Sequence, residues 1–280
     1  MNFRDSLIVK PGKRARLADI DPAFHGEHED KNSAVPEFEA ALDTIDRLQE
    51  KLYAEKKHAL LIVLQGIDAA GKDGVCWNVI TAMNPQGCAV SSFKQPSAVE
   101  LAHDFLWRIH QKTPGRGQVA VFNRSHYEDV LIVRVHDLVP KDIWKKRYDQ
   151  INAFEHVLAE NNTTILKFFL YISKDEQLDR FRKRLEDPER QWKISGSDYT
   201  EREYWDQYIE AYEDMLSKCS TEDAPWFVIP SNKKWFRNLA VAKIIAETME
   251  GLNIRPPAPD VDIAEIRKKY HAAVAEEKKG

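Results

Sequence analysis

Residues 66–74 read GIDAAGKDG and directly follow an apolar run, ALLIVL, at residues 59–64. A glycine, four residues, a second glycine and a lysine is the spacing of a Walker A phosphate loop. Such a loop joins a buried strand to a helix whose first backbone N–H groups point at bound phosphate. Gly66 and Gly71 permit backbone angles that a Cβ would penalise, and Lys72 supplies positive charge to phosphate oxygens. The alternative is a strand-to-helix turn without a ligand, but strand, spacing, lysine and helix all agree with phosphate binding.

Two carboxylates distinguish this loop from the usual pattern. Asp73 stands where Ser or Thr would place a hydroxyl on Mg²⁺, and Asp68 lies inside the loop. Carboxylates beside a polyanion repel it unless metal ions lie between them. The sequence therefore predicts a phosphate site that works together with a divalent metal.

The composition indicates a soluble globular protein, with 280 residues, 43% hydrophobic and 31% charged. No apolar run approaches the ~20 residues of a membrane span, and the start lacks a signal-peptide core, so no membrane partner is expected. Cys76, Cys88 and Cys219 show no metal-ligand spacing, which favours reduced thiols in a cytoplasm. A net charge of −4 argues against a nucleic-acid partner but is compatible with a local basic channel.

Helical and strand periods alternate along the chain, which predicts a doubly wound α/β fold with a parallel sheet. Strands are expected at residues 59–65, 88–93, 118–122, 164–172 and 225–230. Helices are expected from Pro36 to about Leu52 and at residues 72–83, 97–112, 141–160, 173–187, 200–218 and 233–250. We expect an irregular polar arm at residues 1–35, one domain at 36–250, and a tail at 251–280.

A second polar cluster, FNRSHYED at residues 122–129, follows the third strand. Ligands of doubly wound sheets collect at the carboxyl ends of strands, so this cluster should face the phosphate loop. Arg124 suits a two-pronged contact with phosphate, and Glu128 and Asp129 are candidate metal ligands. Asn123 stands where many P-loop enzymes have a metal-organising Asp. The alternative is a capped helix start with a solvated pair of carboxylates.

A third cluster gathers Arg and Lys side chains at residues 180–193. Its position after a strand, with a break at Asp187-Pro188, predicts a mobile lid at about residues 182–200. Lids of phosphoryl-transfer enzymes close basic side chains over the phosphates and exclude water. The alternative is an ordinary solvated helix face. Candidates for an outer continuation of the same basic channel are Lys94, Lys112 and Arg116.

These three clusters together resemble the family-2 polyphosphate kinases over residues 36–250. The resemblance is carried by the phosphate loop with its Asp73-Gly74 ending, by the 122–129 cluster, and by the lid with Arg184 and Trp192-Lys193. It implies a P-loop kinase fold of three α/β/α layers, similar to thymidylate kinase, with a five-stranded parallel sheet and a helical lid. It also implies reversible phosphoryl transfer between inorganic polyphosphate and nucleotides, dependent on Mg²⁺ or alternatively Mn²⁺, in a homo-oligomer such as a dimer or tetramer.

The resemblance assigns roles to individual positions. Its implied catalytic residues are Asp68, Lys72, Arg124, Glu128 and Asp129, of which Asp68, Asp129 and Glu128 are the implied metal ligands. Its implied phosphate- and nucleotide-binding residues are Gly66, Ala69, Ala70, Gly71, Asp73, Gly74, Arg134, Arg184 and Lys193. The NRSHYED sequence at 123–129 is similar to the subclass that accepts both nucleoside mono- and diphosphates, so AMP and ADP are the expected acceptors, with GMP and GDP beside them.

Two other functions compete with this hypothesis. An ATP-dependent nucleoside or nucleotide kinase would use the same fold, but it is expected to carry Ser or Thr after Lys72, where this chain has Asp73. A regulatory module that binds nucleotide without transfer chemistry would need no lid, so the basic segment at 180–193 argues against it.

Overall fold

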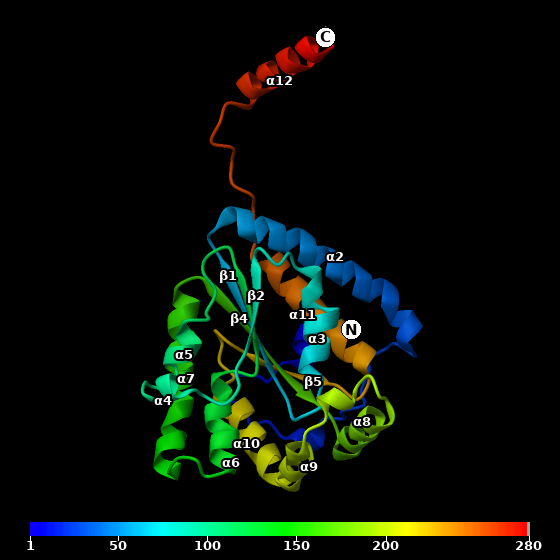
Figure 1. Cartoon of the computed structure of the whole chain (residues 1–280), viewed down its shortest axis with the longest axis vertical. Helices are drawn as coiled ribbons and strands as arrows, with labels where there is room; N and C mark the ends of the chain where they lie inside the picture. Colours follow the sequence, from blue (N-terminus) through cyan, green and yellow to red (C-terminus); the bar gives the residue numbers. More distant parts are fainter. Residues whose placement is uncertain (279–280) are drawn as a thin grey trace.

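A five-stranded parallel sheet forms the centre of the protein, in a computed structural model that describes residues 1–278 (Figure 1). The strands are β1 (Ala59–Gln65), β2 (Cys88–Ser92), β3 (Val119–Asn123), β4 (Thr163–Tyr171) and β5 (Trp226–Pro230). Their order across the sheet is β2-β3-β1-β4-β5, and all neighbours run parallel. The five strands predicted from the sequence are confirmed, each to within one residue at either end.

Helices cover both faces of this sheet. The helices are α1 (Phe3–Leu7), α2 (Lys31–Glu55), α3 (Lys72–Asn78), α4 (Ala98–Leu101), α5 (Trp107–His110), α6 (Ile132–Val135), α7 (Lys141–Glu160), α8 (Lys174–Glu186), α9 (Gly196–Glu203), α10 (Trp205–Lys218), α11 (Lys234–Gly251) and α12 (Ile263–Glu277). Short 3₁₀ turns are η1 (Leu17–Asp19), η2 (Ile80–Ala82), η3 (His126–Val130) and η4 (Gln191–Lys193). The helices α1, α2, α3 and α11 pack on one face, and α7, α10 and η3 pack on the other (Figure 1).

The central strand β1 explains why the sheet needs two helical layers. Every residue of β1 is buried, as expected for an unbroken apolar run in a parallel sheet. Because side chains alternate along a strand, Ile62 and Leu64 enter the core under α2 and α11, while Leu61 and Val63 enter the core under α7 and α10. This double burial fixes the end of β1, from which the phosphate loop leaves.

The predicted helices differ from the observed ones in three places. The single helix expected at 97–112 is two short helices, α4 and α5, because the Asp104 side chain accepts from the Leu106 N–H at 3.0 Å and starts a new turn. The helix expected at 72–83 ends at Asn78 and continues as η2. The single helix expected at 200–218 is two helices, α9 and α10, which Tyr204 separates, and the first begins at Gly196 because Ser195 and Asp198 form a capping box there.

The first 35 residues are more ordered than their polar composition indicates. Helix α2 begins at Lys31 rather than at Pro36, because Asp30 caps it by accepting from the Ser33 N–H at 2.9 Å. Phe3 and Leu17 are buried. The expected irregular arm therefore contains helical turns that join the core, while the limits 36–250 of the expected domain stay a prediction.

The last described helix, α12, stands away from the body of the protein on an extended connection (Figure 1). Its residues are exposed apart from one intermediate position, Val274. Among the described residues, no helix is long and apolar enough to cross a membrane.

Candidate active site

The phosphate loop and the second polar cluster meet at the carboxyl end of the sheet, as the sequence predicts. Leu64 on β1 is in register with Asn123 on β3, so the two segments leave neighbouring strands side by side. The Asn123 side-chain amide donates to the Asp73 carboxylate at 2.7 Å, and Arg124 donates to the Asp68 carboxylate at 2.9 Å. The order of the strands reverses beside β1, which is where open α/β sheets bind their ligands.

The backbone of the loop has the left-handed angles that a phosphate cradle needs. Gly71 has a φ of +111°, and a Cβ at Gly66 would lie 2.8 Å from the Leu170 carbonyl oxygen. Ala69 is left-handed as well, with a φ of +64°, a conformation that costs about 1–2 kcal/mol for a residue with a Cβ. Among residues 1–278, no side chain caps the start of α3 after Gly71, so its first N–H groups are available to a ligand.

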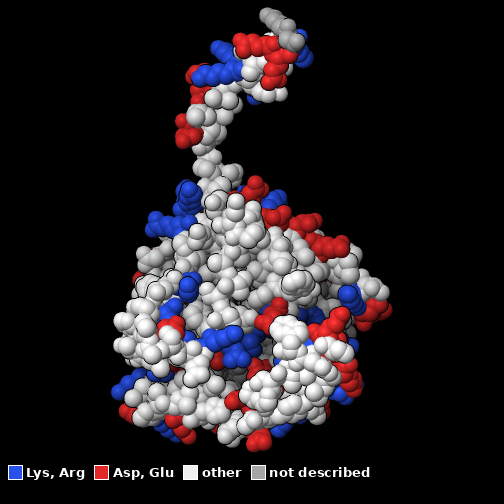
Figure 2. All heavy atoms as spheres, in the orientation of Figure 1, with Lys and Arg blue, Asp and Glu red and all other residues white. Residues whose placement is uncertain are grey.

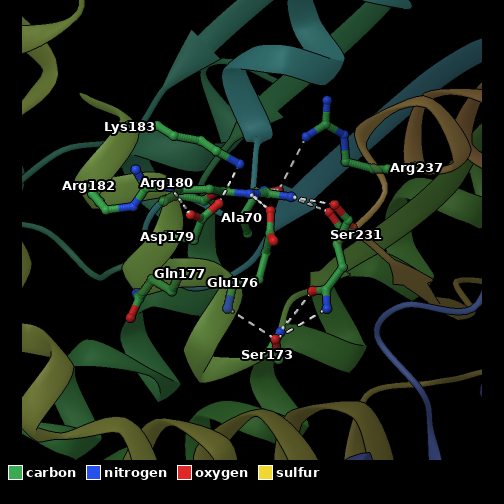
Figure 3. A network of polar contacts seen from close by, with 12 residues as sticks. Ala70, Ser173, Glu176, Gln177, Asp179, Arg180, Arg182, Lys183, Ser231 and Arg237 are labelled. Carbon is green, nitrogen blue, oxygen red and sulfur yellow. Dashed lines mark hydrogen bonds and ion pairs between the residues drawn. The ribbon is translucent and has the colours of Figure 1, made fainter. Parts of the chain in front are cut away.

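A buried arginine on α8 stabilises the loop through hydrogen bonds to its backbone. Arg180 on α8 donates to the carbonyl oxygens of Ala69 and Ala70 at 2.8 and 2.9 Å, and also to the Ser231 carbonyl after β5 (Figure 3). Gln177, one turn earlier on α8, donates to the Asp68 carbonyl at 3.0 Å. Arg180, predicted as part of the basic segment at 180–193, instead fixes the loop, a role for which its helical charge pattern contains no signal.

Lys72 is folded back onto the loop that carries it. Its ammonium group donates to the Gly66 carbonyl oxygen at 2.6 Å. Burial and the neighbouring Arg124 lower the pKa of Lys72, while Asp68 and Glu128 act in the opposite direction. A bound phosphate would add negative charge beside this group and favour its protonated form.

Arg124 lies at the centre of the charged groups. Its backbone is left-handed, with a φ of +63°, which is uncommon outside glycine and is typical of functional sites. Burial opposes its charge, yet Glu128 and Asp68 together raise the pKa of Arg124. Burial likewise raises the pKa of Glu128, against the effect of Arg124 and Lys72. The structure therefore brings four of the five candidate catalytic residues, Asp68, Lys72, Arg124 and Glu128, into one electrostatic unit.

Asp129 points to a different partner. Its carboxylate accepts from Arg147 on α7 at 2.7 Å. Burial raises the pKa of Asp129 to about 6, and Arg147 and Arg108 reduce that rise. Glu128 and Asp129 both belong to η3, and neither lines the cavity described below.

A fully buried network anchors η3 to the core. Tyr127 donates to the Glu155 carboxylate at 2.8 Å, and Lys167 on β4 pairs with the same carboxylate at 2.5 Å. His126 lies 3.1 Å from Glu155, so both residues before Glu128 contact one buried carboxylate. The turn that carries Glu128 is thus held in place from within the protein.

The donor set at the loop fits a hard divalent cation. The carboxylates of Asp68 and Asp73 line the cavity beside the Asn123 amide, and oxygen ligands are those that Mg²⁺ prefers. Residues 1–278 contain no group of three or more His, Cys, Asp or Glu side chains arranged to hold a metal. The pair of carboxylates at Asp68 and Asp73 suits Mg²⁺, because this ion is usually bound by one or two carboxylates together with waters and substrate phosphates.

A large basic cavity opens over the loop, with a volume of about 1210 Å³. Eleven Lys and Arg side chains line it against three Asp side chains, and Lys and Arg atoms gather in a hollow on the face drawn in Figure 2. The lining includes Arg184, Lys193 and Lys94. A cavity with this excess of positive charge attracts a polyanion.

The lid residues border this cavity from α8, η4 and α9. Arg184 pairs with Asp198 at 3.6 Å, and the Lys193 ammonium lies 5.0 Å from the centre of the Trp192 ring. Trp192 lines the cavity although its side chain is 76% exposed. These contacts join residues within the expected lid segment at 182–200.

Three expected phosphate-binding or channel residues lie elsewhere. Arg134 on α6 pairs with Glu210 and Asp214 of α10 at 2.5 and 2.7 Å and stacks on Trp144, so its charge is already neutralised within the protein. Lys112 and Arg116 do not line the cavity, because α5 ends before them and the chain turns away into β3.

The fold and this site define a P-loop phosphotransferase of the kinase class. Residues 28–257 match the family model described as Polyphosphate kinase 2. The chain therefore belongs to the polyphosphate kinase 2 family, which confirms the resemblance read from the sequence and the P-loop kinase fold. Enzymes of this family generally need a divalent metal.

Named relatives agree with this assignment. The AMP/ADP-polyphosphate phosphotransferase of Meiothermus ruber is 50% identical over 253 residues, which is 90% of this chain and 95% of the relative. The ADP-polyphosphate phosphotransferase of Rhodopseudomonas palustris is 50% identical over 77% of this chain and 79% of its own. The crystal structure of polyphosphate kinase 2 from Arthrobacter aurescens superimposes with a TM-score of 0.93, at 42% identity, over 99% of this chain and 97% of that one.

Proposed function

We propose that this protein transfers phosphoryl groups reversibly from inorganic polyphosphate to AMP and ADP, with Mg²⁺ as the metal and Mn²⁺ as a substitute. The observation that carries the proposal is the cavity over the phosphate loop, with eleven cationic side chains against three carboxylates. Both substrates of such a reaction are phosphate anions, so the site must neutralise charge on donor and acceptor together. The 50%-identical relative that is named for AMP, ADP and polyphosphate supports the same substrates.

The groups at the phosphate loop and Arg124 would have different roles in phosphoryl transfer. Lys72 and the N–H groups at the start of α3 would hold the oxygens of the transferring group, and Arg124 would bind the opposite side of it. Asp68 would orient Arg124 through their 2.9 Å bond and hold the metal together with Asp73. The bound metal would neutralise charge between the phosphates. Positioning and charge neutralisation are most of what phosphoryl transfer requires of a protein.

Glu128 is the residue that we connect with the use of AMP. It is fixed by the buried network around Glu155 and acts electrostatically on Arg124 and Lys72. A carboxylate at this position would recruit a metal ion or hold Arg124 so that an acceptor with one phosphate fewer is still in line. GMP and GDP are proposed as further acceptors.

The test is a transfer assay with purified polyphosphate as donor and AMP, ADP, GMP and GDP as acceptors, with and without Mg²⁺. We expect ADP from AMP and ATP from ADP, and a much lower rate when ATP replaces polyphosphate as donor. Transfer from ATP alone would favour the ATP-dependent kinase instead. Binding of nucleotides without turnover would favour a regulatory module.

We also propose a homo-oligomer, a dimer or a tetramer, in the cytoplasm. The free thiols Cys76, Cys88 and Cys219 fit a reducing compartment, and the exposed Val90 on edge strand β2 offers apolar surface to a second copy. Light scattering of the purified protein measures its mass against the 32.4 kDa of one chain.

A further inference from the structure

A lysine is buried in the middle of strand β4, away from the phosphate loop. Lys167 is fully buried, and its ammonium group donates to the Tyr127 hydroxyl at 2.8 Å and to the Cys219 carbonyl oxygen at 2.6 Å. It also pairs with Glu155 on α7. Removing an ammonium group from water is costly, so packing alone does not explain a lysine at this position.

The partner of Lys167 is a buried carboxylate with several polar neighbours. Glu155 accepts from Lys167 and from Tyr127 at 2.8 Å, and the His126 Nε2 atom lies 3.1 Å from it. Burial would raise the pKa of Glu155, but Lys167 and His126 outweigh burial and lower it, so the carboxylate keeps its charge. A buried ion pair is often no more stable than apolar residues of the same volume, so stability alone does not explain the presence of this pair.

The 3₁₀ turn η3 joins this ion pair to the active site. It begins with His126 and Tyr127, which both contact Glu155. The next residue is Glu128, whose carboxylate acts electrostatically on Arg124. A 3₁₀ helix of five residues is long for its type, because its hydrogen-bond geometry is poor. Contacts with neighbouring elements therefore determine where η3 lies, and the buried network supplies such contacts from α7 and β4.

We propose that Tyr127, Glu155 and Lys167 are positioning residues that set the place of Glu128 beside Arg124 and, through it, the use of AMP as acceptor. The inference rests on the proposed function, in which Glu128 keeps a shorter acceptor in line. All three side chains lie outside the lining of the cavity, so they act through the backbone that joins Tyr127 to Glu128. A small shift is sufficient, because a misplacement of about 1 Å can lower a rate ~100-fold.

The first experiment compares Tyr127→Phe with Tyr148→Phe, a matched control. Each variant removes one hydroxyl from the same buried core, and the Tyr148 hydroxyl accepts from Arg134 at 3.3 Å, away from Glu155. Both should therefore lower the melting temperature by similar amounts. We expect Tyr127→Phe to lower the ratio of kcat/KM for AMP to kcat/KM for ADP about threefold, a part of what ~1 Å of misplacement costs. Tyr148→Phe should keep the wild-type ratio, and equal ratios in the two variants would overturn the positioning role.

A double-mutant cycle tests whether Tyr127 acts through Glu128. Residues that act through one another have non-additive effects, so Glu128→Asn with Tyr127→Phe should have the same ratio as Glu128→Asn alone. A further threefold fall in the double variant would show that Tyr127 acts by another route, and the proposal would then be wrong.

The ion pair is tested by an apolar replacement, Glu155→Leu with Lys167→Met. Such replacements are often neutral or stabilising, so circular dichroism should show a folded protein. We expect the ratio to fall at least as far as in Tyr127→Phe, because the Tyr127 hydroxyl has lost both of its partners. A wild-type ratio in the folded double variant would make the pair purely structural. Should this variant fail to fold, the comparison of the two tyrosine variants decides.

Amide hydrogen exchange separates this inference from the proposed function, because it needs neither substrate nor turnover. We expect residues 126–130 to exchange about threefold faster in Tyr127→Phe than in the wild type or in Tyr148→Phe, since a turn that loses its buried contacts opens more often. Faster exchange beside a wild type that fails to phosphorylate AMP would keep the positioning of η3 and refute the acceptor range. AMP phosphorylation by the wild type, with exchange and ratio unaltered in Tyr127→Phe, would remove the positioning role and leave the function standing.

Discussion

The two ends of helix α8 are built differently, although both carry arginines at helical spacing. At its start, Gln177 and Arg180 are buried and hold three carbonyl oxygens of the phosphate loop. At its end, Leu185 is half exposed, and beyond it the Trp192 side chain is 76% exposed. Arg184 lies one turn after Arg180, yet its ion pair with Asp198 stays within the expected lid.

This difference separates a fixed part of the site from a segment that can move. We call the fixed part, the phosphate loop at residues 66–74 with Gln177 and Arg180, the cradle. Bonds to buried backbone carbonyls keep the loop in one shape, because breaking them would leave polar groups unsatisfied. Exposed segments with few buried apolar contacts open at low free energy, as the lids of phosphoryl-transfer enzymes must. Substitutions in the cradle should therefore change the rate of the chemical step, and substitutions in the lid should change how tightly the donor is held.

Lys72→Ala gives the largest expected effect and tests the fixed cradle. Loss of a charge that acts on the transferring group removes about 3 kcal/mol or more, which is a decrease in kcat of over ~100-fold. Lys145→Ala, an exposed lysine on α7, is the control and should keep the wild-type rate. Turnover of Lys72→Ala within a few-fold of the wild type would exclude the loop from the mechanism.

Asp68→Asn is expected next and distinguishes two roles in the cradle. A neutral amide is a weaker ligand for a hard cation, so the variant should need about tenfold more Mg²⁺ for half-maximal rate. If Asp68 only orients Arg124 through their 2.9 Å bond, kcat falls at an unchanged Mg²⁺ requirement. Rates measured over a range of Mg²⁺ concentrations separate these outcomes.

Glu128→Asn should change the acceptor range with a smaller loss of overall rate. We expect AMP phosphorylation to fall about tenfold more than ADP phosphorylation, because misplacement of a shorter acceptor lowers the rate steeply. The parallel measurement is Asp129→Asn, whose partner Arg147 lies on α7, and this variant should leave the AMP-to-ADP ratio unaltered. Equal losses with both acceptors would make Glu128 a general catalytic or structural group.

The sequence predicts the phosphate loop itself better than the distant arginines that contact it. Strand β1 is a nearly continuous apolar run, and the loop between β1 and α3 has a fixed spacing, so both can be predicted from local sequence. Arg180 and Arg237 contact Ala70 across 110 and 167 positions of the chain. Their pairing depends on how α8 and α11 pack, and a single arginine in a helical charge pattern contains no signal of that.

The dependence on helix packing also explains why Arg134, an expected phosphate-binding residue, lies away from the cavity. Arg134 and Arg184 both lie in the last turn of a helix, but α6 packs on α10, whose carboxylates neutralise Arg134, while Arg184 lines the cavity. The predicted end of α8 at Asp187-Pro188 is confirmed, since the helix ends at Glu186. This end could be predicted because proline restricts the backbone of the residue before it. Breaks made by single side chains, such as Asp104 between α4 and α5, are not visible in the apolar pattern.

Arg184→Gln gives the smallest expected effect and tests whether the outer end of α8 acts as a lid. We expect the KM for polyphosphate to rise about threefold at nearly unchanged kcat, because a partly exposed contact is worth about 1 kcal/mol or less. Arg182→Gln is the matched control, since Arg182 pairs with Asp179 and Glu186 and does not line the cavity. Screening weakens such contacts, so the difference between the two variants should shrink as ionic strength rises above ~0.15 M. A loss of kcat in Arg184→Gln as large as that in Lys72→Ala, at any salt concentration, would show that both ends of α8 belong to the cradle.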